Sequence, residues 1–228
     1  MILTEDQHHR IEEAVTAAES HTWGEIVCVV AGEASDYREV GLAWATIVSL
    51  VLPPITLVLG IHPLLLTASP ASWTASQASS VHAQIAFALS AYAMIQVLLF
   101  VIVWGVVSIP KVRQLVTPTF IKRERVRATA VAQFQSAAAG RTDARTGVLI
   151  FVSVGERQVE VIADKAIHDI AGQAMWDQVV ASVQAGMATG DPASGIIKAV
   201  EMVGVVLKQH FPHEGADVNA ISDAVIEI

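Results

Sequence analysis

Charge is missing from one long stretch of this sequence. The 71 residues from Val40 to Pro110 contain no Asp, Glu, Lys or Arg, although the chain of 228 residues carries 14 basic and 22 acidic side chains. All of those charges therefore fall in the remainder, whose charged fraction is close to that of an ordinary soluble domain. This distribution predicts one modest soluble domain combined with a membrane part.

Cysteine and positive charge are also scarce. Cys28 is the only cysteine, which excludes an intrachain disulfide, and its apolar surroundings IVCVVA favour a buried, unreactive thiol. The net charge of −8 argues against nucleic acid as a partner. The sequence contains no G-x-S-x-G, H-E-x-x-H, P-loop or Rossmann glycine pattern, so no familiar catalytic motif assigns an enzyme class.

Two apolar segments within the uncharged stretch are long enough to span a membrane. They cover residues 42–61 and 85–109, and about 20 helical residues cross the roughly 30 Å hydrocarbon core. The rest of the chain is too small to bury both as core helices. We therefore predict a transmembrane hairpin in a lipid bilayer, over residues 40–110. Neither segment contains an ionisable group, which argues against an ion or proton path.

The flanking basic residues predict the orientation of this hairpin. The connecting loop, residues 62–84, contains no Lys or Arg, whereas six basic residues follow the second segment. The positive-inside rule then places both termini in the cytoplasm, on a multi-pass protein of the plasma (inner) membrane. The basic residues are Lys111, Arg113, Lys122, Arg123, Arg125 and Arg127.

The charged remainder reads as a single α/β domain that the hairpin interrupts. A capped helix from Thr4 and a β-rich run, Glu25–Ala31, precede the hairpin, in residues 1–39. A lone strand is not stable in water, so this run must join strands from beyond the hairpin. Those strands are Val148–Val152, apolar on both faces, and the alternating Gln158–Ala163. We predict a central mixed sheet flanked by helices on both faces.

The helices of this domain are predicted from hydrophobic spacing and caps. One runs through Phe120–Gly140, a short one covers Lys165–Ile170, and a third carries Trp176. The last begins at Asp191–Pro192 and stops before Pro212, which ends the domain at residue 212. The acidic tail, residues 213–228, is expected to be loosely held.

The order of these elements resembles the TPM domain family, which is named for a thylakoid lumen protein, a photosystem assembly factor and a nematode receptor accessory protein. The resemblance covers about 150 residues outside the hairpin. It is carried by Thr146–Val148, Val159–Val161 and Gly190–Gly195. The stretch Asn219–Asp223 also partly resembles a terminal signature, typically NELPD, of a bacterial membrane-bound branch.

The resemblance implies an α/β sandwich fold and leaves two functions open. Some family members are described as acid phosphatases, some as divalent-cation binders, and others as assembly or auxiliary factors of membrane complexes. The family has no uniform catalytic motif to carry over. We therefore expect an accessory, assembly or stability factor for a membrane protein complex, or alternatively a membrane-tethered, metal-assisted acid phosphatase.

Candidate site residues lie where strands end and helices begin, as ligand sites in α/β folds do. If the chain folds back on itself, Asp164 and Asp191 could approach each other and hold Ca²⁺ or Mg²⁺, or share a proton for phosphoester cleavage. Each could instead simply cap a helix. Further candidates are Asp169 for the metal, and Asp143, Arg145 and Trp176 for substrate, against the alternatives of a solvated turn and core packing.

Overall fold

The computed structural model describes residues 2–60, 78–138, 146–212 and 224–228. The chain forms two compact units. The first consists of Met1–Asp36 together with Pro118–Ile228, and the second is Tyr37–Thr117. The second unit is therefore inserted into the sequence of the first.

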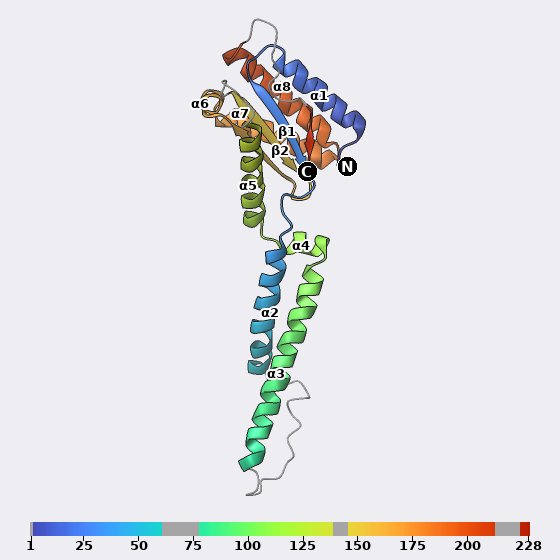
Figure 1. Ribbon diagram of the computed structural model, residues 1–228, viewed down its shortest axis with the longest axis vertical. Coiled ribbons are helices and arrows are strands. Elements are labelled where there is room, and N and C mark those ends of the chain that lie inside the picture. The colour runs from blue at the N-terminus through green and yellow to red at the C-terminus, as the bar shows by residue number, and fades with distance from the viewer. Residues whose placement is uncertain (1, 61–77, 139–145, 213–223) are drawn as a thin grey trace. The chain divides into compact units, whose positions relative to one another are not determined.

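A four-stranded mixed sheet forms the centre of the first unit (Figure 1). Its strand order is β3-β2-β1-β4, with β1 at Glu25–Ala31, β2 at Gly147–Ser153, β3 at Gln158–Ala163 and β4 at Ile226–Glu227. β1 is parallel to β2 and to β4, and β2 is antiparallel to β3. Cys28 pairs with Ile150 although the second unit separates them along the chain. The predicted mixed α/β sheet is confirmed.

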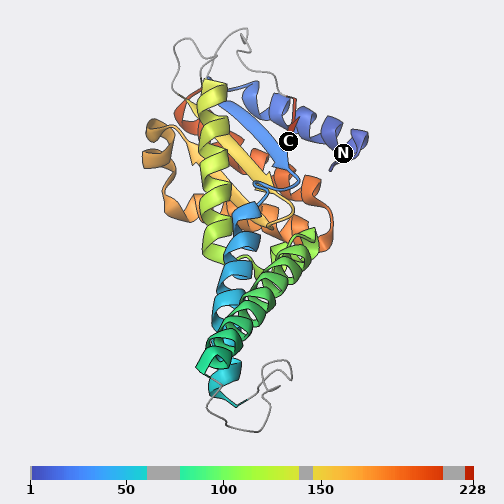
Figure 2. The ribbon, with the colours of Figure 1, turned by 60° about the horizontal axis from the view of Figure 1, so that its bottom comes forward.

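Helices cover both faces of this sheet (Figures 1 and 2). On one face lie α1 (Glu5–Glu19), α7 (Gln173–Thr189) and α8 (Pro192–His210), and on the other lies α5 (Thr119–Ala138). Alternate residues of β2 therefore enter two separate cores. Ile150 packs with the first group of helices, whereas Phe151 packs against Val126 and Ala130 of α5. This arrangement explains why β2 is apolar without alternation.

Local sequence signals begin and end these helices as expected. Thr4 and Gln7 form a capping box at the start of α1. Gly190, at φ +81°, ends α7 in the left-handed conformation that glycine adopts without steric cost. Asp191 then caps α8, with Pro192 in its first turn. α6 (Lys165–Ala171) is the predicted short helix.

The end of the tail is not loosely held, and that prediction was wrong for residues 225–228. Ile226 and Glu227 pair with Val29 and Val30 of β1, and Val225 is buried. Backbone hydrogen bonds continue the pairing, because Gly32 donates to the Ile228 carbonyl at 3.0 Å. The sequence predicted no strand there because only two residues pair, which is too short a run to show alternation.

The second unit is a helical hairpin of α2 (Arg38–Val58) and α3 (Ala78–Val107), followed by the short α4 (Pro110–Val116). α2 starts before the predicted residue 42 and ends before residue 61. Its buried face consists of Gly41, Ala45, Ser49 and Pro53 with Val40, and small residues at this spacing let helix backbones approach closely. Large apolar side chains of α3, Phe87 and Leu98 among them, are exposed.

Both helices of this hairpin are long and apolar enough to cross a membrane, over Arg38–Val58 and Ile85–Val107. No residue in an apolar 18-residue segment of α3 is buried within the protein. In the corresponding segment of α2, only 28% of the residues are buried. Core helices of a soluble protein would be mostly buried. The apolar side chains of the hairpin are therefore not explained by packing within the described chain.

Candidate functional site

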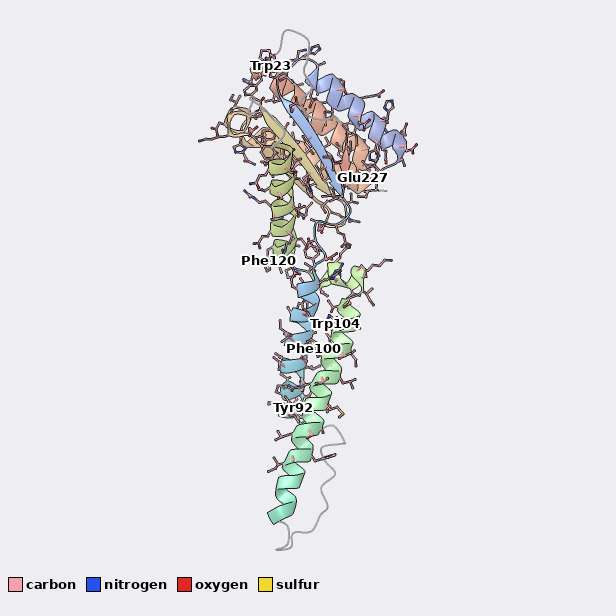
Figure 3. All side chains as sticks on the ribbon, in the orientation of Figure 1. Trp23, Tyr92, Phe100, Trp104, Phe120 and Glu227 are labelled. Carbon is pink, nitrogen blue, oxygen red and sulfur yellow. The ribbon has the colours of Figure 1, made fainter. Side chains whose placement is uncertain are left out.

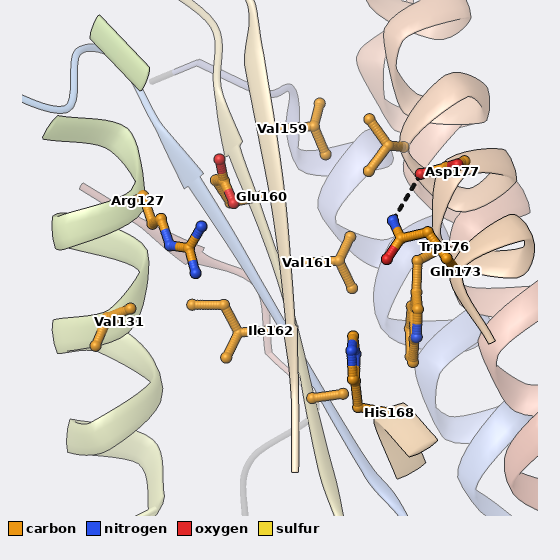
Figure 4. Close-up of a pocket in the computed structure, with 12 residues that line it drawn as sticks. Arg127, Val131, Val159, Glu160, Val161, Ile162, His168, Gln173, Trp176 and Asp177 are labelled. Carbon is orange, nitrogen blue, oxygen red and sulfur yellow. Dashed lines mark hydrogen bonds between the residues drawn. The ribbon is translucent and has the colours of Figure 1, made fainter. Parts of the chain in front are cut away.

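A pocket of the first unit follows the open edge of the sheet at β3 (Figure 4). It encloses about 410 Å³. Its floor is β3, and its two walls come from the helices on opposite faces of the sheet. Arg127 and Val131 of α5 line one wall, and His168 of α6 with Gln173, Trp176, Asp177 and Val180 of α7 line the other. We call this pocket the edge groove.

The backbone of β3 presents to the edge groove hydrogen-bonding groups that no other described strand pairs. The Asp164 N–H donates to the Gly147 carbonyl at 3.0 Å, so Asp164 faces β2. Residues of an antiparallel strand alternate between facing the neighbouring strand and facing away. In this register the N–H and C=O groups of Val159, Val161 and Ala163 point away from β2, toward the free edge. An edge of this kind is a template for a further strand.

Trp176 brings a buried donor to the same groove. Its side chain is only 6% exposed and packs in the core, yet its indole N–H has no hydrogen-bond partner among the described residues. The ring stacks on His168 with 6.3 Å between centroids and 10° between the planes. A buried donor without an acceptor costs about 1–3 kcal/mol. The Nε1 atom has almost no exposed surface, so a ligand in the groove can supply its acceptor only if the indole shifts.

The α5 wall of the edge groove is charged. Glu160 projects from β3 toward Arg127 (Figure 4). Partial burial raises the pKa of Glu160, while the nearby Arg127 and Arg123 act in the opposite direction. On the α7 wall, Gln173 Nε2 donates to Asp177 Oδ1 at 2.8 Å. The groove thus offers donors and acceptors on both sides of an extended backbone.

The structure places the two principal aspartates in structural roles. Asp164 occupies the N-cap position of α6, but its Oδ2 accepts the Gly147 N–H at 2.8 Å and makes no cap hydrogen bond to the helix. Asp191 caps α8 by accepting the Ser194 N–H at 3.3 Å, and it also accepts from Gln7 Nε2 at 3.4 Å. Both carboxylates hold backbone in place.

Asp164 and Asp191 do not approach each other, so the two-carboxylate site we expected does not form. Asp164 lies beside Gly147, at the end of the sheet where β1 begins. Asp191 lies at the start of α8. The opposite end of α8 lies near the start of β1, where the Trp23 N–H donates to the Phe211 carbonyl. α8 has 19 residues, which is about 28 Å of helix.

The described acidic residues do not fit Ca²⁺ or Mg²⁺. No three His, Cys, Asp or Glu side chains in the described part of the chain are grouped to hold a metal ion, whereas Ca²⁺ takes six to eight oxygen ligands. Asp169 is exposed on α6. Asp143 and Arg145 lie outside the described residues.

Among the predicted site residues that the structure describes, Trp176 is the one that lines the edge groove. Sequence reasoning missed Arg127, His168, Gln173 and Asp177, which lie on three helices. The alternation of Gln158–Ala163 did indicate a half-exposed strand. It carried no signal for which helices would stand on either side.

Comparisons with known proteins agree with this fold. The family model of the TPM domain matches residues 110–206. The NMR structure of the BA42 protein from the psychrophilic bacterium Bizionia argentinensis is similar with a TM-score of 0.53, over 99% of this chain and 94% of that chain. Its sequence identity of 16% supports the fold alone. No curated protein matches the chain. The resemblance to the TPM domain family is therefore confirmed over residues 110–206.

Proposed function

We propose that this protein is a membrane-anchored accessory factor whose TPM domain binds a protein of a membrane complex in the edge groove. The observation that carries the proposal is the edge of β3, which no other described strand pairs, beside Trp176, whose buried indole N–H has no acceptor among the described residues. The edge of β3 lacks a row of main-chain hydrogen-bonding partners, and the indole N–H of Trp176 lacks an acceptor. An extended polypeptide segment that binds in the edge groove supplies main-chain groups of both kinds.

The shape of the edge groove favours a single extended segment over a second folded sheet. Arg127 and Val131 stand on one side of β3, and Trp176 and Asp177 stand on the other. A neighbouring sheet would bring its own covering helices against these walls. A lone strand needs only the roughly 4.8 Å spacing between paired backbones, with its side chains directed alternately to the two walls.

The hairpin supports the membrane part of the proposal. Its two helices meet the length and composition of membrane spans and expose apolar side chains along α3. Because the hairpin is inserted between β1 and α5, the chain leaves and re-enters the TPM domain on the same side of the bilayer. The basic residues after α3 then favour the cytoplasmic side for the domain and both termini.

Site-directed photocrosslinking tests whether a partner occupies the edge groove. A photoreactive phenylalanine analogue replaces Gln173 in one variant and Gln178 in another, within native membranes. Both glutamines are exposed on α7, but only Gln173 lines the groove. We expect one discrete crosslinked protein from position 173 and none from position 178. Absence of a crosslink at 173, or the same product from both positions, would contradict the proposal.

The second candidate is a membrane-tethered acid phosphatase assisted by Ca²⁺ or Mg²⁺. The observation in its favour is the match of residues 110–206 to the TPM domain, a family in which some members are described as acid phosphatases. Its test is hydrolysis of a generic phosphomonoester at acid pH by the purified chain, with each cation added in turn. Because both carboxylates hold backbone in place, activity that disappears in Asp164→Asn and Asp191→Asn supports it only where the unfolding free energy of the variants is unchanged. Activity that survives both changes would exclude these aspartates as catalytic residues.

A further inference from the structure

The second unit has a pocket of its own at the end of the hairpin where α2 begins and α3 ends. It encloses about 410 Å³ and lies entirely within residues 37–117. Its lining consists of two arginines, a serine, a glycine and three large apolar side chains. The residues are Arg38, Gly41, Leu42, Trp104, Val107, Ser108 and Arg113.

The charged part of this pocket suits a phosphate. Arg38 is the first residue of α2 and Arg113 belongs to α4, so the two guanidinium groups come from different helices. No acidic residue lines the pocket. Each arginine already has an interaction within the chain, but a guanidinium has five N–H donors and can bind phosphate as a fork. The N-terminus of α2 adds a favourable dipole for an anion.

The apolar part of the pocket suits the chain of a lipid. Leu42, Val107 and Trp104 form it, and Trp104 is 47% exposed on α3 (Figure 3). Tryptophan is enriched at the level of lipid headgroups because its ring is apolar and its N–H is polar. A second tryptophan, Trp44, donates its indole N–H to the Val116 carbonyl at 3.2 Å and holds α4 beside α2.

The position of the pocket along the hairpin places it where lipid phosphates lie. The apolar spans run over Arg38–Val58 and Ile85–Val107, so Arg38 and Val107 mark one boundary of the hydrocarbon region. Arg113 lies beyond this boundary, on α4. Leu115 on the same short helix is 85% exposed, as expected of a helix that lies at the membrane surface.

We propose that this pocket binds the phosphate of an anionic phospholipid headgroup, held by Arg38 and Arg113, with an acyl chain against Leu42 and Val107. The inference rests on the membrane part of the proposed function and is independent of the edge groove. It predicts a preference for an anionic over a zwitterionic lipid of the same chain length. Pairing one lipid with two arginines would also fix the ends of α2, α3 and α4 against one another.

Native mass spectrometry of the full chain in detergent tests the proposal, with phosphatidylglycerol and phosphatidylethanolamine as probes. We expect Arg38→Gln and Arg113→Gln each to weaken phosphatidylglycerol binding about tenfold, as loss of a charge-assisted contact does. Lys111→Gln is the matched control, because Lys111 is exposed on the same short helix and does not line the pocket. It should change binding less than twofold. Unaltered helical circular dichroism shows that the variants are folded.

The other outcomes separate the alternatives. Equal binding of both lipids by the wild-type chain, or an equal loss in Lys111→Gln, would overturn the proposal in favour of unspecific surface attraction. Complete competition by inorganic phosphate at millimolar concentration would overturn it in favour of a soluble phosphate ligand. Extraction of the wild-type chain from membranes by alkaline carbonate would refute the membrane anchor itself. Retention in the membrane without lipid preference would refute only this site.

Discussion

Glu227 joins the two ends of the chain, because its Oε1 accepts the backbone N–H of Leu3 at 2.8 Å (Figure 3). The Ile2 N–H donates to the same carboxylate, and His8 Nε2 lies 3.4 Å from Oε1. Glu227 belongs to β4, the strand that pairs with the edge of β1. The first residues therefore hold the last strand in the sheet.

We expect Glu227→Ala to lower the free energy of unfolding by about 1 kcal/mol, the usual contribution of a partly exposed hydrogen bond. Amide hydrogen exchange at Gly32 and Ile228 should accelerate, because both N–H groups bond across β1 and β4. Exchange in β2 should not change. Undisturbed protection of Ile228 in the variant would show that the carboxylate does not hold β4.

The same contact should depend on pH. The Leu3 N–H lowers the pKa of Glu227 below its ordinary value of 4.5, and the Ile2 N–H and His8 add to this effect against a smaller cost of burial. A lowered pKa in the folded state stabilises the fold above the ordinary value and ceases to do so as the pH falls through the folded value. The protection factor of the Ile228 N–H, which compares its exchange with that of an unfolded chain at the same pH, should therefore fall below about pH 4.5. Glu227→Gln should remove that dependence.

Cys28 should be unreactive in the native protein. It is buried in β1, and burial raises the pKa of its thiol to about 12, with Glu19 adding to the effect. The thiolate is the reactive form, so it is scarcely populated at neutral pH. We expect no reaction with a thiol reagent such as Ellman's at pH 8 until denaturant unfolds the domain. Rapid labelling of the folded chain would contradict the placement of β1.

Gly186 should tolerate no side chain. A Cβ there would lie 2.8 Å from the Gly195 Cα and from the Asp191 carbonyl oxygen, both of them backbone atoms that cannot turn aside. We expect Gly186→Ala to destabilise the domain by about 3 kcal/mol, at the upper end of overpacking effects. Gly32→Ala is the control, because its Cβ would meet only the Ile2 side chain at 3.6 Å. Urea denaturation of both variants compares them, and equal midpoints would refute the close contact of α7 with α8.

Asp191 should matter for stability. Its carboxylate caps α8 and accepts from Gln7, so Asp191→Ala should cost about 1 kcal/mol, as loss of a helix cap does. Asp169→Ala removes the same charge from an exposed position on α6 and should leave the unfolding free energy within about 0.5 kcal/mol. An effect at Asp169 as large as that at Asp191 would argue for general charge effects.

Much of the fold followed from local patterns. The absence of alternation in Val148–Val152 predicted a covered strand, and the cores on both sides of β2 confirm this. The alternation in Gln158–Ala163 predicted a half-exposed strand, and most of β3 is of intermediate burial. A lone strand at Glu25–Ala31 required partners beyond the apolar segments, and the pairing of Cys28 with Ile150 supplies them. These inferences succeed because periodicity and unpaired backbone groups are properties of each segment.

The candidate site did not follow in the same way. Asp164 and Asp191 both end or begin elements, which suggested that they could meet, but the length of α8 keeps them at separate ends of the domain. The edge groove draws Arg127 and Trp176 from helices on opposite faces of the sheet. The local sequence of neither helix predicts which strand the helix will flank.

The sequence by itself therefore determined the elements, their caps, the sheet's need for β1 and the uncharged hairpin, because each depends on neighbours along the chain. Only the tertiary structure decided that β4 returns to pair with β1. Within the part of the chain that the structure describes, it also decided that β3 remains an open edge and that Trp176 carries a buried N–H without a partner. Those features depend on packing between segments far apart in sequence, where side-chain volume and chain reversal decide which groups meet.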